Sequence, residues 1–287
     1  MTQTNLRVEA VRVPESGLAT EARAAAVVWQ REMIRFLKDR TRILSSLAQP
    51  LLFLFVLGSG LGSLLGRGGG GIALPTFLFP GVLAISVLFT AAFSGISIVW
   101  DREFGFLREM LVAPVSTTSI LVGKAVGGST VATLQCVLLL ALAGLVGVPY
   151  DPVMFLELLV LIFLMAFMIC SLGLMLAARL RQVQTAMPMV QLIITPLMFL
   201  SGALFPLGNL PTWLTVLTHL NPMTYAVEPL RHVVFARLDA SPADLARFDP
   251  GIHWGSFLVP TWLEIVLTIA FSALLLALAV RRFRRTE

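Results

Sequence analysis

The sequence predicts an all-α polytopic membrane protein with six transmembrane helices. Of its 287 residues, 57% are hydrophobic and 13% are charged, and the mean hydropathy is +0.88. A soluble domain carries roughly twice that charged fraction. The apolar residues also gather in uncharged runs of about 20 residues, each long enough to cross a hydrocarbon core of about 30 Å as a helix. An ordinary water-soluble enzyme is therefore excluded.

Six apolar runs define the predicted spans. They cover residues 44–65, 75–99, 125–148, 153–178, 186–205 and 257–280. Helix is the expected conformation, because a lipid-exposed strand cannot satisfy its own backbone hydrogen bonds. In this prediction Lys124 opens the third span and reaches the inner membrane interface.

The distribution of basic residues predicts the orientation. With the N-terminus in the cytoplasm, 17 of the 21 Lys and Arg residues fall on the cytoplasmic side. Cytoplasmic loops of membrane proteins carry this excess, so the net charge of +5 indicates topology rather than a nucleic-acid partner. We expect both termini in the cytoplasm. The heavy use of Arg over Lys is typical of a GC-rich bacterial genome, and we expect the protein in the bacterial cell (inner) membrane.

The sequence divides into three parts. Residues 1–21 have scattered charge and predict a flexible cytoplasmic tail, and residues 22–42 predict an amphipathic interfacial helix. Residues 43–287 are expected to form a six-helix transmembrane domain, with a cytoplasmic loop at 100–118 and an outer segment at 206–256. Two short amphipathic stretches in the outer segment predict a re-entrant hairpin before the last span.

Residues 22–42 combine a basic face with an apolar face. At about 100° per residue, Arg31, Arg35, Lys38 and Arg42 share one face. Such a helix can lie in the inner interface and contact a cytoplasmic partner. It can equally be a simple membrane anchor, and the two interpretations are compatible.

The loop after the second span mixes charges and apolar residues at helical spacing. Its charged residues are Asp101, Arg102, Glu103, Arg108 and Glu109, and its apolar residues include Phe106, Leu107, Met110 and Leu111. Apolar anchors with a charged rim suit docking into a groove on a soluble protein. The alternative is a plain surface turn between two spans.

Two segments resemble the type-2 ATP-binding cassette exporter permeases, with the daunorubicin-resistance branch nearest. The first runs from Asp101 to Ser116 and continues with Ile120–Lys124, which is similar to the family's signature loop. The second comprises residues 199–206, 210–213 and 220–231, which resemble the family's segment after the fifth span. With the expected topology, the likeness covers roughly residues 22–285.

The resemblance implies a permease that exports a hydrophobic or amphipathic, drug-like or lipid-like molecule. The chain contains no Gly-x-x-x-x-Gly-Lys-Ser/Thr loop, so we expect no cofactor and no enzymatic activity in this chain. ATP and Mg²⁺ would bind a partner ATPase. The family implies two ATPase copies and two permeases, with a homodimer expected and a paralogous partner as the alternative. The ATPase-docking residues implied are Asp101, Arg102, Glu103, Gly105, Phe106, Leu107, Arg108, Glu109 and Met110, with Arg31 and Arg35.

The predicted substrate pathway rests on five residues of the second and fifth spans. They are Phe89, Phe93, Thr195, Met198 and Phe199. Aromatic and methionine side chains suit an adaptable apolar cavity. Ordinary helix packing or lipid contact is the alternative for each. Five glycines can instead mark close helix approaches: Gly81, Gly95, Gly127, Gly128 and Gly202.

Other functions find less support in the sequence. The three histidines, His219, His232 and His253, show no metal-binding spacing, so no metal site is expected. A proton-coupled secondary transporter predicts acids near the membrane midplane, which the sequence does not suggest. Glu228 and Arg231 are expected to form a local ion pair. A passive scaffold would not need the docking loop. Export of polysaccharides or lipids is the alternative within the family.

Overall fold

The structure is a computed structural model that describes residues 17–60, 72–107, 110, 115–208, 210–238, 241–242, 244 and 248–286. The predicted tail lies almost entirely outside these residues. Its last residues, from Leu18 onward, are helical rather than flexible. Residues 61–65 of the first predicted span also lie outside the described part.

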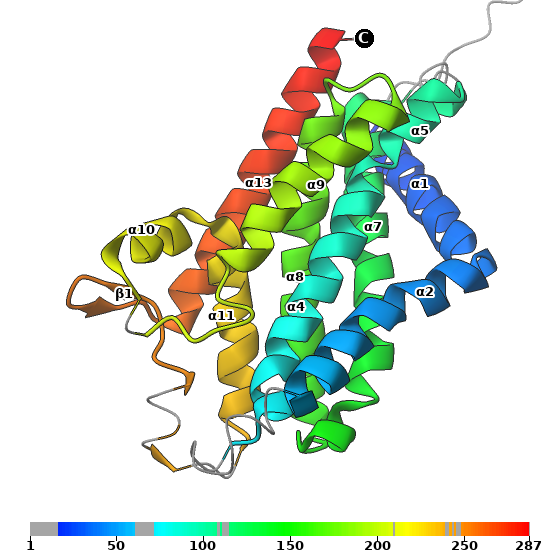
Figure 1. The fold of residues 1–287 in the computed structure, drawn as a ribbon. Coiled ribbons are helices and arrows are strands. Elements are labelled where there is room, and N and C mark those ends of the chain that lie inside the picture. The colour runs from blue at the N-terminus through cyan, green and yellow to red at the C-terminus, as the bar shows by residue number, and fades with distance from the viewer. Residues whose placement is uncertain are drawn as a thin grey trace, which may run out of the picture.

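The described chain is built from helices and one short hairpin (Figure 1). The first half contains α1 (Leu18–Lys38), α2 (Arg40–Leu51), η1 (Leu52–Leu57), α4 (Leu74–Ile96), α5 (Ile98–Glu103), α7 (Thr117–Leu140) and η2 (Ala143–Val146). The second half contains α8 (Pro152–Ala177), α9 (Val183–Phe199), α10 (Thr212–Leu220), α11 (Pro222–Phe235), β1 (His253–Trp254), β2 (Phe257–Leu258) and α13 (Thr261–Thr286).

Five helical segments are long and apolar enough to cross a membrane. They are Ile43–Gly60, Leu74–Glu103, Thr117–Leu140, Pro152–Ala177 and Thr261–Arg285. The fifth predicted span corresponds to α9, an apolar helix of 17 residues that continues into a turn. The all-α polytopic membrane fold is confirmed, while the count of six spans and the re-entrant hairpin stay predictions.

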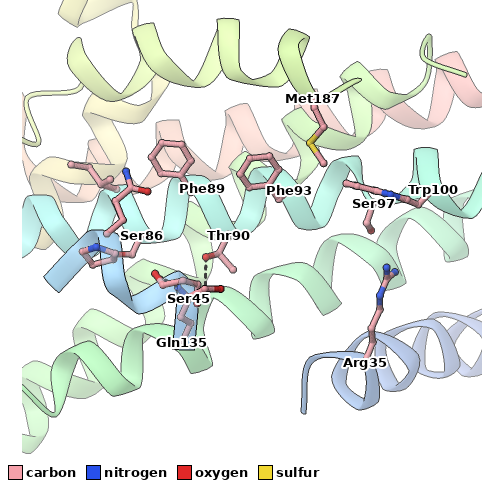
Figure 2. Close-up of a pocket in the computed structure, with 14 residues that line it drawn as sticks. Arg35, Ser45, Ser86, Phe89, Thr90, Phe93, Ser97, Trp100, Gln135 and Met187 are labelled. Carbon is pink, nitrogen blue, oxygen red and sulfur yellow. Dashed lines mark hydrogen bonds between the residues drawn. The ribbon is translucent and has the colours of Figure 1, made fainter. Parts of the chain in front are cut away.

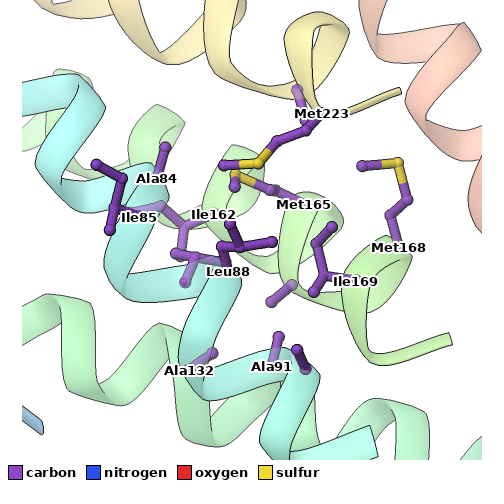
Figure 3. Packing of buried hydrophobic residues seen from close by; sticks show 14 of the residues in the cluster. Ala84, Ile85, Leu88, Ala91, Ala132, Ile162, Met165, Met168, Ile169 and Met223 are labelled. Carbon is purple, nitrogen blue, oxygen red and sulfur yellow. The ribbon is translucent and has the colours of Figure 1, made fainter. Parts of the chain in front are cut away.

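The second predicted span forms the centre of the bundle. Within its apolar window, 89% of the residues are buried inside the protein. Figure 3 shows Ala84, Leu88 and Ala91 of α4 facing Ile162 and Met165 of α8. Small side chains on α4 let large ones on α8 fill the space between the helices, which holds the core at high density.

Three of the five predicted close helix approaches are present, at Gly95, Gly127 and Gly128, whereas Gly81 meets the backbone of the turn after α9 and Gly202 belongs to that turn. A Cβ atom added to Gly95 of α4 would collide with the backbone carbonyl of Cys170 on α8, and one on Gly128 would lie 2.7 Å from Cys170 Sγ. Additional atoms at these positions would force the helices apart, so the glycines set the distance between α4, α7 and α8.

The two ends of the bundle differ, and Figure 1 shows both. The α5 end contains α5, the start of α7 and the C-terminal end of α13, where Arg284 donates a hydrogen bond to Thr118. The α11 end contains α10, α11 and the β1–β2 hairpin. These two names are used below.

Three predicted boundaries are corrected. The amphipathic helix begins at Leu18 rather than at residue 22 and is interrupted at Asp39, so residues 40–42 belong to α2. The third span begins at Thr117 rather than at residue 125, because the Ser116 side chain caps the helix by accepting from the backbone N–H of Ser119. Lys124 therefore lies inside the helix.

The last span begins at Thr261 rather than at Phe257. Phe257 and Leu258 form β2, which pairs with Trp254 and His253 around a turn that contains Gly255 at φ 65°. The apolar run continues from β2 into the span, but the helix begins only after Pro260, whose carbonyl oxygen accepts from the backbone N–H groups of Leu263 and Glu264.

Candidate functional site

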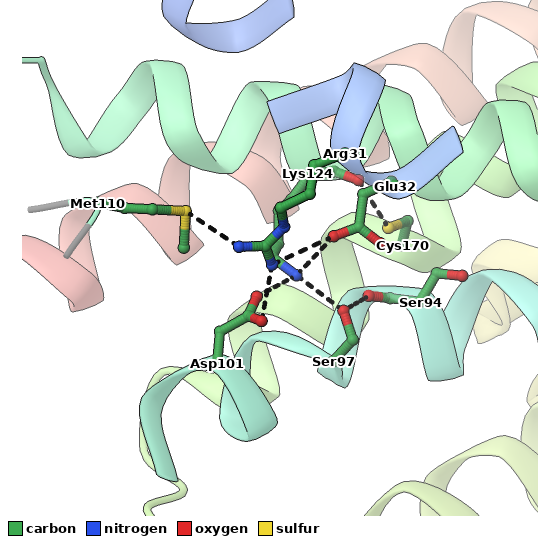
Figure 4. A network of polar contacts seen from close by, with 8 residues as sticks. All are labelled: Arg31, Glu32, Ser94, Ser97, Asp101, Met110, Lys124 and Cys170. Carbon is green, nitrogen blue, oxygen red and sulfur yellow. Dashed lines mark hydrogen bonds and ion pairs between the residues drawn. The ribbon is translucent and has the colours of Figure 1, made fainter. Parts of the chain in front are cut away.

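Four charged side chains form a buried network at the α5 end (Figure 4). The Lys124 ammonium lies 2.6 Å from Asp101 Oδ2 and 3.0 Å from Glu32 Oε1. Arg31 Nη2 lies 2.7 Å from Asp101 Oδ1. Two cations face two carboxylates, so the network is electrically balanced. It joins α1, α5 and α7, which are far apart in sequence.

Burial makes this network sensitive to the loss of any member. Lys124 is 1% exposed and Asp101 is 3% exposed. An isolated buried charge is costly, and removing one partner of a buried pair destabilises a protein by about 3–5 kcal/mol. The position of α1 therefore depends on the charges of α5 and α7.

Glycines on α7 allow α1 to approach closely enough for these ion pairs. A Cβ atom on Gly123 would lie 2.6 Å from the Ala25 carbonyl oxygen, and one on Gly127 would lie 3.0 Å from Glu32 Cβ. Trp29 also donates a hydrogen bond from Nε1 to Thr130 at 3.1 Å. The contacts make α1 a packed part of the bundle as well as an amphipathic helix.

A second link joins the start of α1 to the start of α7. The Glu21 carboxylate accepts hydrogen bonds from the backbone N–H and hydroxyl of Ser116 and from the Ser119 hydroxyl. These hydrogen bonds hold the pKa of Glu21 below its ordinary value, and the bond from the Ser119 hydroxyl has the largest effect. The carboxylate form is thus the one that ties the two helices together.

Several residues that were predicted to dock the ATPase make contacts within this chain instead. Asp101 belongs to the buried network, and Leu107 is buried. Arg102 donates hydrogen bonds to the carbonyl oxygens of Ala177 and Leu180 and lies 5.1 Å from the centre of the Phe283 ring. Sequence reasoning placed these side chains on a docking surface, but their polar atoms contact other helices of the same chain.

Glu103 is exposed, and its carboxylate also contacts another part of the same chain. Its Oε2 accepts a hydrogen bond from the backbone N–H of Val183 at 2.8 Å. Val183 is the first residue of α9, where free N–H groups favour a negative charge. The end of α5 is thereby fixed to the start of α9.

The exposed part of the loop is aromatic. Phe104 is 68% exposed and Phe106 is 52% exposed, on either side of Gly105 at φ 85°. Met110 is half-buried, and its sulfur lies 3.6 Å from Arg31 Nη1. Arg108 and Glu109 lie outside the described residues. Two exposed phenylalanines beside a buried charge network give the loop one outward-facing and one inward-facing side.

A cavity of about 390 Å³ lies next to the network (Figure 2). Residues of α1, α2, α4, α5, α7 and α9 line it. They are Arg35, Ser45, Ser46, Gln49, Pro50, Ile85, Ser86, Phe89, Thr90, Phe93, Ser97, Trp100, Gln135 and Met187. Aromatic rings, hydroxyl groups and amides thus share one lining.

The cavity has distinct apolar and polar sides. Phe89 and Phe93 stack with their ring centres 6.4 Å apart. Thr90 donates a hydrogen bond to Gln135 Oε1 at 2.7 Å, and Gln135 Nε2 donates to the Ser46 carbonyl oxygen at 3.4 Å. Such a lining can accept a molecule that carries both an apolar part and hydrogen-bonding groups.

The cavity gathers some of the predicted pathway residues and leaves others out. Phe89 and Phe93 line it, as does Arg35, which was predicted for docking. Thr195 instead bonds Gln191 on its own helix, Met198 is buried in the core and Phe199 is exposed.

Sequence reasoning missed the polar lining and the partners of Lys124. A glutamine inside an apolar helix, Gln135, was a detectable signal, because polar side chains in membrane helices are costly and often functional. Glu32 gave no such signal, because an acid on an amphipathic helix ordinarily faces water.

The fold and these two features define a polytopic α-helical membrane protein with an amphipathic cavity coupled to a charge network. Residues 23–235 match the family model described as ABC-2 type transporter. The chain belongs to the ABC-2 type transporter family, and its transport-permease class is thereby confirmed. The match does not single out the daunorubicin-resistance branch.

Curated relatives include proteins of two kinds. The protein ycf38 of Cyanophora paradoxa, named as a transport permease, is 29% identical over 239 residues, which cover 79% of this chain and 80% of the relative. Nodulation protein J of Rhizobium leguminosarum bv. trifolii is 30% identical over 213 residues, covering 72% and 79%. Nodulation protein J of Neorhizobium galegae is 28% identical over 249 residues, covering 85% and 90%.

Proposed function

We propose that this chain is the transmembrane permease subunit of an ATP-driven exporter of hydrophobic or amphipathic molecules. The ATPase is a separate cytoplasmic subunit in two copies, and two permease copies, most simply identical, enclose the pathway. The observation that carries the proposal is the continuity of the charge network with the cavity through Ser97. Ser97 lines the cavity and accepts a hydrogen bond from Lys124 at 2.9 Å.

The α5 end faces the cytoplasm in this proposal. The basic residues Arg179, Arg181, Arg281 and Arg282 lie at that end, in agreement with the rule for cytoplasmic positive charge. The exposed Phe104 and the loop around it would then meet the ATPase. The protein would reside in a bacterial inner membrane with both termini inside.

Coupling follows from the contacts of the loop. An ATPase that binds Phe104 and Phe106 would displace α5 when it changes conformation, and Asp101 is a residue of α5. Movement of Asp101 changes its distance to Arg31 and Lys124, and Lys124 also holds Ser97 in the cavity wall. ATP can bias only states whose contacts differ, and these buried ion pairs supply such a difference. Alternating access at the permease interface would result.

The cavity lining supports an amphipathic cargo. Phe89 and Phe93 offer an apolar surface, and Thr90 and Gln135 offer hydrogen bonds. The hydroxyl and amide groups favour hydroxyl-bearing head groups, and Arg35 adds one positive charge to the lining, so a lipid or a saccharide-bearing molecule is the alternative to a drug-like cargo.

Reconstitution tests the function. We expect an ABC ATPase to co-purify with the chain from native membranes. Proteoliposomes containing both should move a fluorescent amphipathic lipid on addition of ATP, and an ATPase variant with its P-loop lysine replaced should not. Transport by the permease alone under a proton gradient would contradict the proposal and support a secondary transporter.

A further inference from the structure

A second group of titratable side chains lies at the α11 end, away from the coupling network. Glu228 and His232 occupy successive turns of α11, and Asp249 lies just before β1. One ligand atom from each lies within 4.8 Å of the others. His232 Nδ1 and Asp249 Oδ2 are 2.6 Å apart. Glu228 is buried, while His232 and Asp249 remain partly open to solvent.

A fourth acid provides an independent observation. Glu264, in the first turn of α13, is 0% exposed, and neither of its carboxylate oxygens has a hydrogen-bond partner among the described residues. Its charge acts on His232, Glu228 and Asp249. Glu228 Oε1 and Asp249 Oδ1 also lack a described hydrogen-bond partner. Unpaired buried acceptors cost free energy, so these oxygens need a proton or a cation.

The local charges indicate a divalent cation. Arg231 lies 3.0 Å from Glu228 Oε2 and also donates to the carbonyl oxygens of Gly202 and Phe205. With His232 neutral and the carboxyl groups of Glu228, Asp249 and Glu264 ionised, the three carboxylates and this one arginine leave two negative charges in the cluster.

We propose that Glu228, His232 and Asp249 bind a divalent transition-metal ion, with Zn²⁺ as the best fit. Zn²⁺ takes imidazole nitrogen and carboxylate oxygen atoms as ligands, in sites that have about four ligands in all. Ca²⁺ and Mg²⁺ prefer oxygen alone, so the histidine disfavours them. The ion would replace the proton shared by His232 and Asp249, and Glu264 would supply a further oxygen or balance the charge.

The metal would join separate elements at the α11 end. Glu228 and His232 belong to α11, Asp249 to the segment before β1, and Glu264 to α13. Arg231 extends the connection to the turn after α9 through Gly202. The bound ion would therefore restrain α11 against α13. If the proposed export function holds, this clamp would stabilise the outward end of the pathway, but metal binding itself does not depend on that function.

Metal binding to the purified chain in detergent tests the proposal. After treatment with EDTA and dialysis against Zn²⁺, we expect a stoichiometric amount of Zn²⁺ by mass spectrometry and a higher Tm. The variants His232→Ala and Asp249→Asn should bind Zn²⁺ at least about tenfold more weakly and lose the Tm increase. His253→Ala is the matched control, because His253 is exposed and lies outside the cluster, and it should bind as the wild type does.

Measurements in EDTA distinguish a loss of metal binding from a loss of folding. Each variant is compared with the wild type in EDTA, where Asp249→Asn should retain a cooperative unfolding transition. Equal Zn²⁺ binding by the wild type and by both cluster variants would overturn the proposal. So would the absence of Zn²⁺ binding by the wild type at neutral pH, which would mean that protons balance the carboxylates.

Discussion

Lys124 and Ser97 connect the charge network to the cavity. The Lys124 ammonium donates to Ser97 Oγ at 2.9 Å, and Ser97 forms part of the cavity wall. Lys124 also contacts Asp101 at 2.6 Å, directly before the exposed loop. A displacement of the loop can therefore reach the cavity through two polar contacts in series.

Asp101→Asn should weaken both folding and coupling. The change removes one of the two carboxylates that balance Arg31 and Lys124 and leaves Glu32 alone against both cations. We expect a loss of about 3–5 kcal/mol in the free energy of unfolding. Thermal unfolding in detergent measures this change, with Glu157→Gln as the control, because the Glu157 side chain is 45% exposed and exposed ion pairs contribute little. An unchanged Tm would show that the network carries no stability.

Phe106→Ala should weaken ATPase binding without reducing stability. Phe106 is more than half exposed, so its removal loses little packing within the chain. A buried aromatic anchor at an interface contributes at least about 1.4 kcal/mol, which corresponds to a tenfold change in affinity. Pull-down of the ATPase measures the effect.

Phe257→Ala provides the matched control for Phe106→Ala. Phe257 is a similarly exposed phenylalanine at the α11 end. The two variants should have similar Tm values and differ in ATPase affinity. Equal affinities would place the docking surface elsewhere.

Phe93→Ala should reduce transport of an amphipathic substrate. Phe93 lines the cavity and stacks on Phe89. Aromatic pairs contribute about 0.5–1.5 kcal/mol beyond their buried area, so the half-maximal substrate concentration should rise about 2–10-fold. Phe163→Ala, which removes a similar stack with Phe167 on α8, should leave that concentration unchanged. An equal effect of both variants would indicate a packing role alone.

Glu21 should contribute a pH-dependent stability. Its folded-state pKa is lowered, so the stabilisation is present above the ordinary value of 4.5 and is lost as the pH falls through the folded pKa. Glu21→Gln should therefore lower Tm at neutral pH and flatten the dependence of Tm on pH in the acid range. The double variant Ser116→Ala/Ser119→Ala should reproduce most of this behaviour, because it removes both hydroxyl donors and leaves only the Ser116 backbone N–H. A wild-type Tm profile without an acid-range decline would contradict the assignment.

The fold was predictable because lipid exposure leaves a strong compositional signal. Uncharged runs located the helices, and Pro152 and Asp151 marked the start of α8 where the sequence predicted it. Predicted helix boundaries were wrong where a helix continues through polar residues that other helices shield from lipid, as at the start of α7 at Thr117. The predicted start of the last span at Phe257 was wrong for the opposite reason, because Phe257 is apolar but belongs to the hairpin that precedes the span.

The candidate site was predictable only in part. Mixed charges and apolar residues identified the loop, and helical spacing on α4 identified Phe89 and Phe93. The predicted pair of Glu228 and Arg231 is confirmed at 3.0 Å. The contact of Arg31 with Asp101 joins residues 70 positions apart, and no periodic pattern encodes such a tertiary contact.

Thiol labelling of the exposed loop tests the central claim most directly. Cys136 and Cys170 are buried, so Phe106→Cys introduces an accessible thiol into the chain. In sealed inside-out vesicles, a membrane-impermeant maleimide should label this thiol, and bound ATPase should protect it. Right-side-out vesicles should remain unlabelled. Labelling from the outside, or equal labelling with and without the ATPase, would contradict a permease driven through this loop.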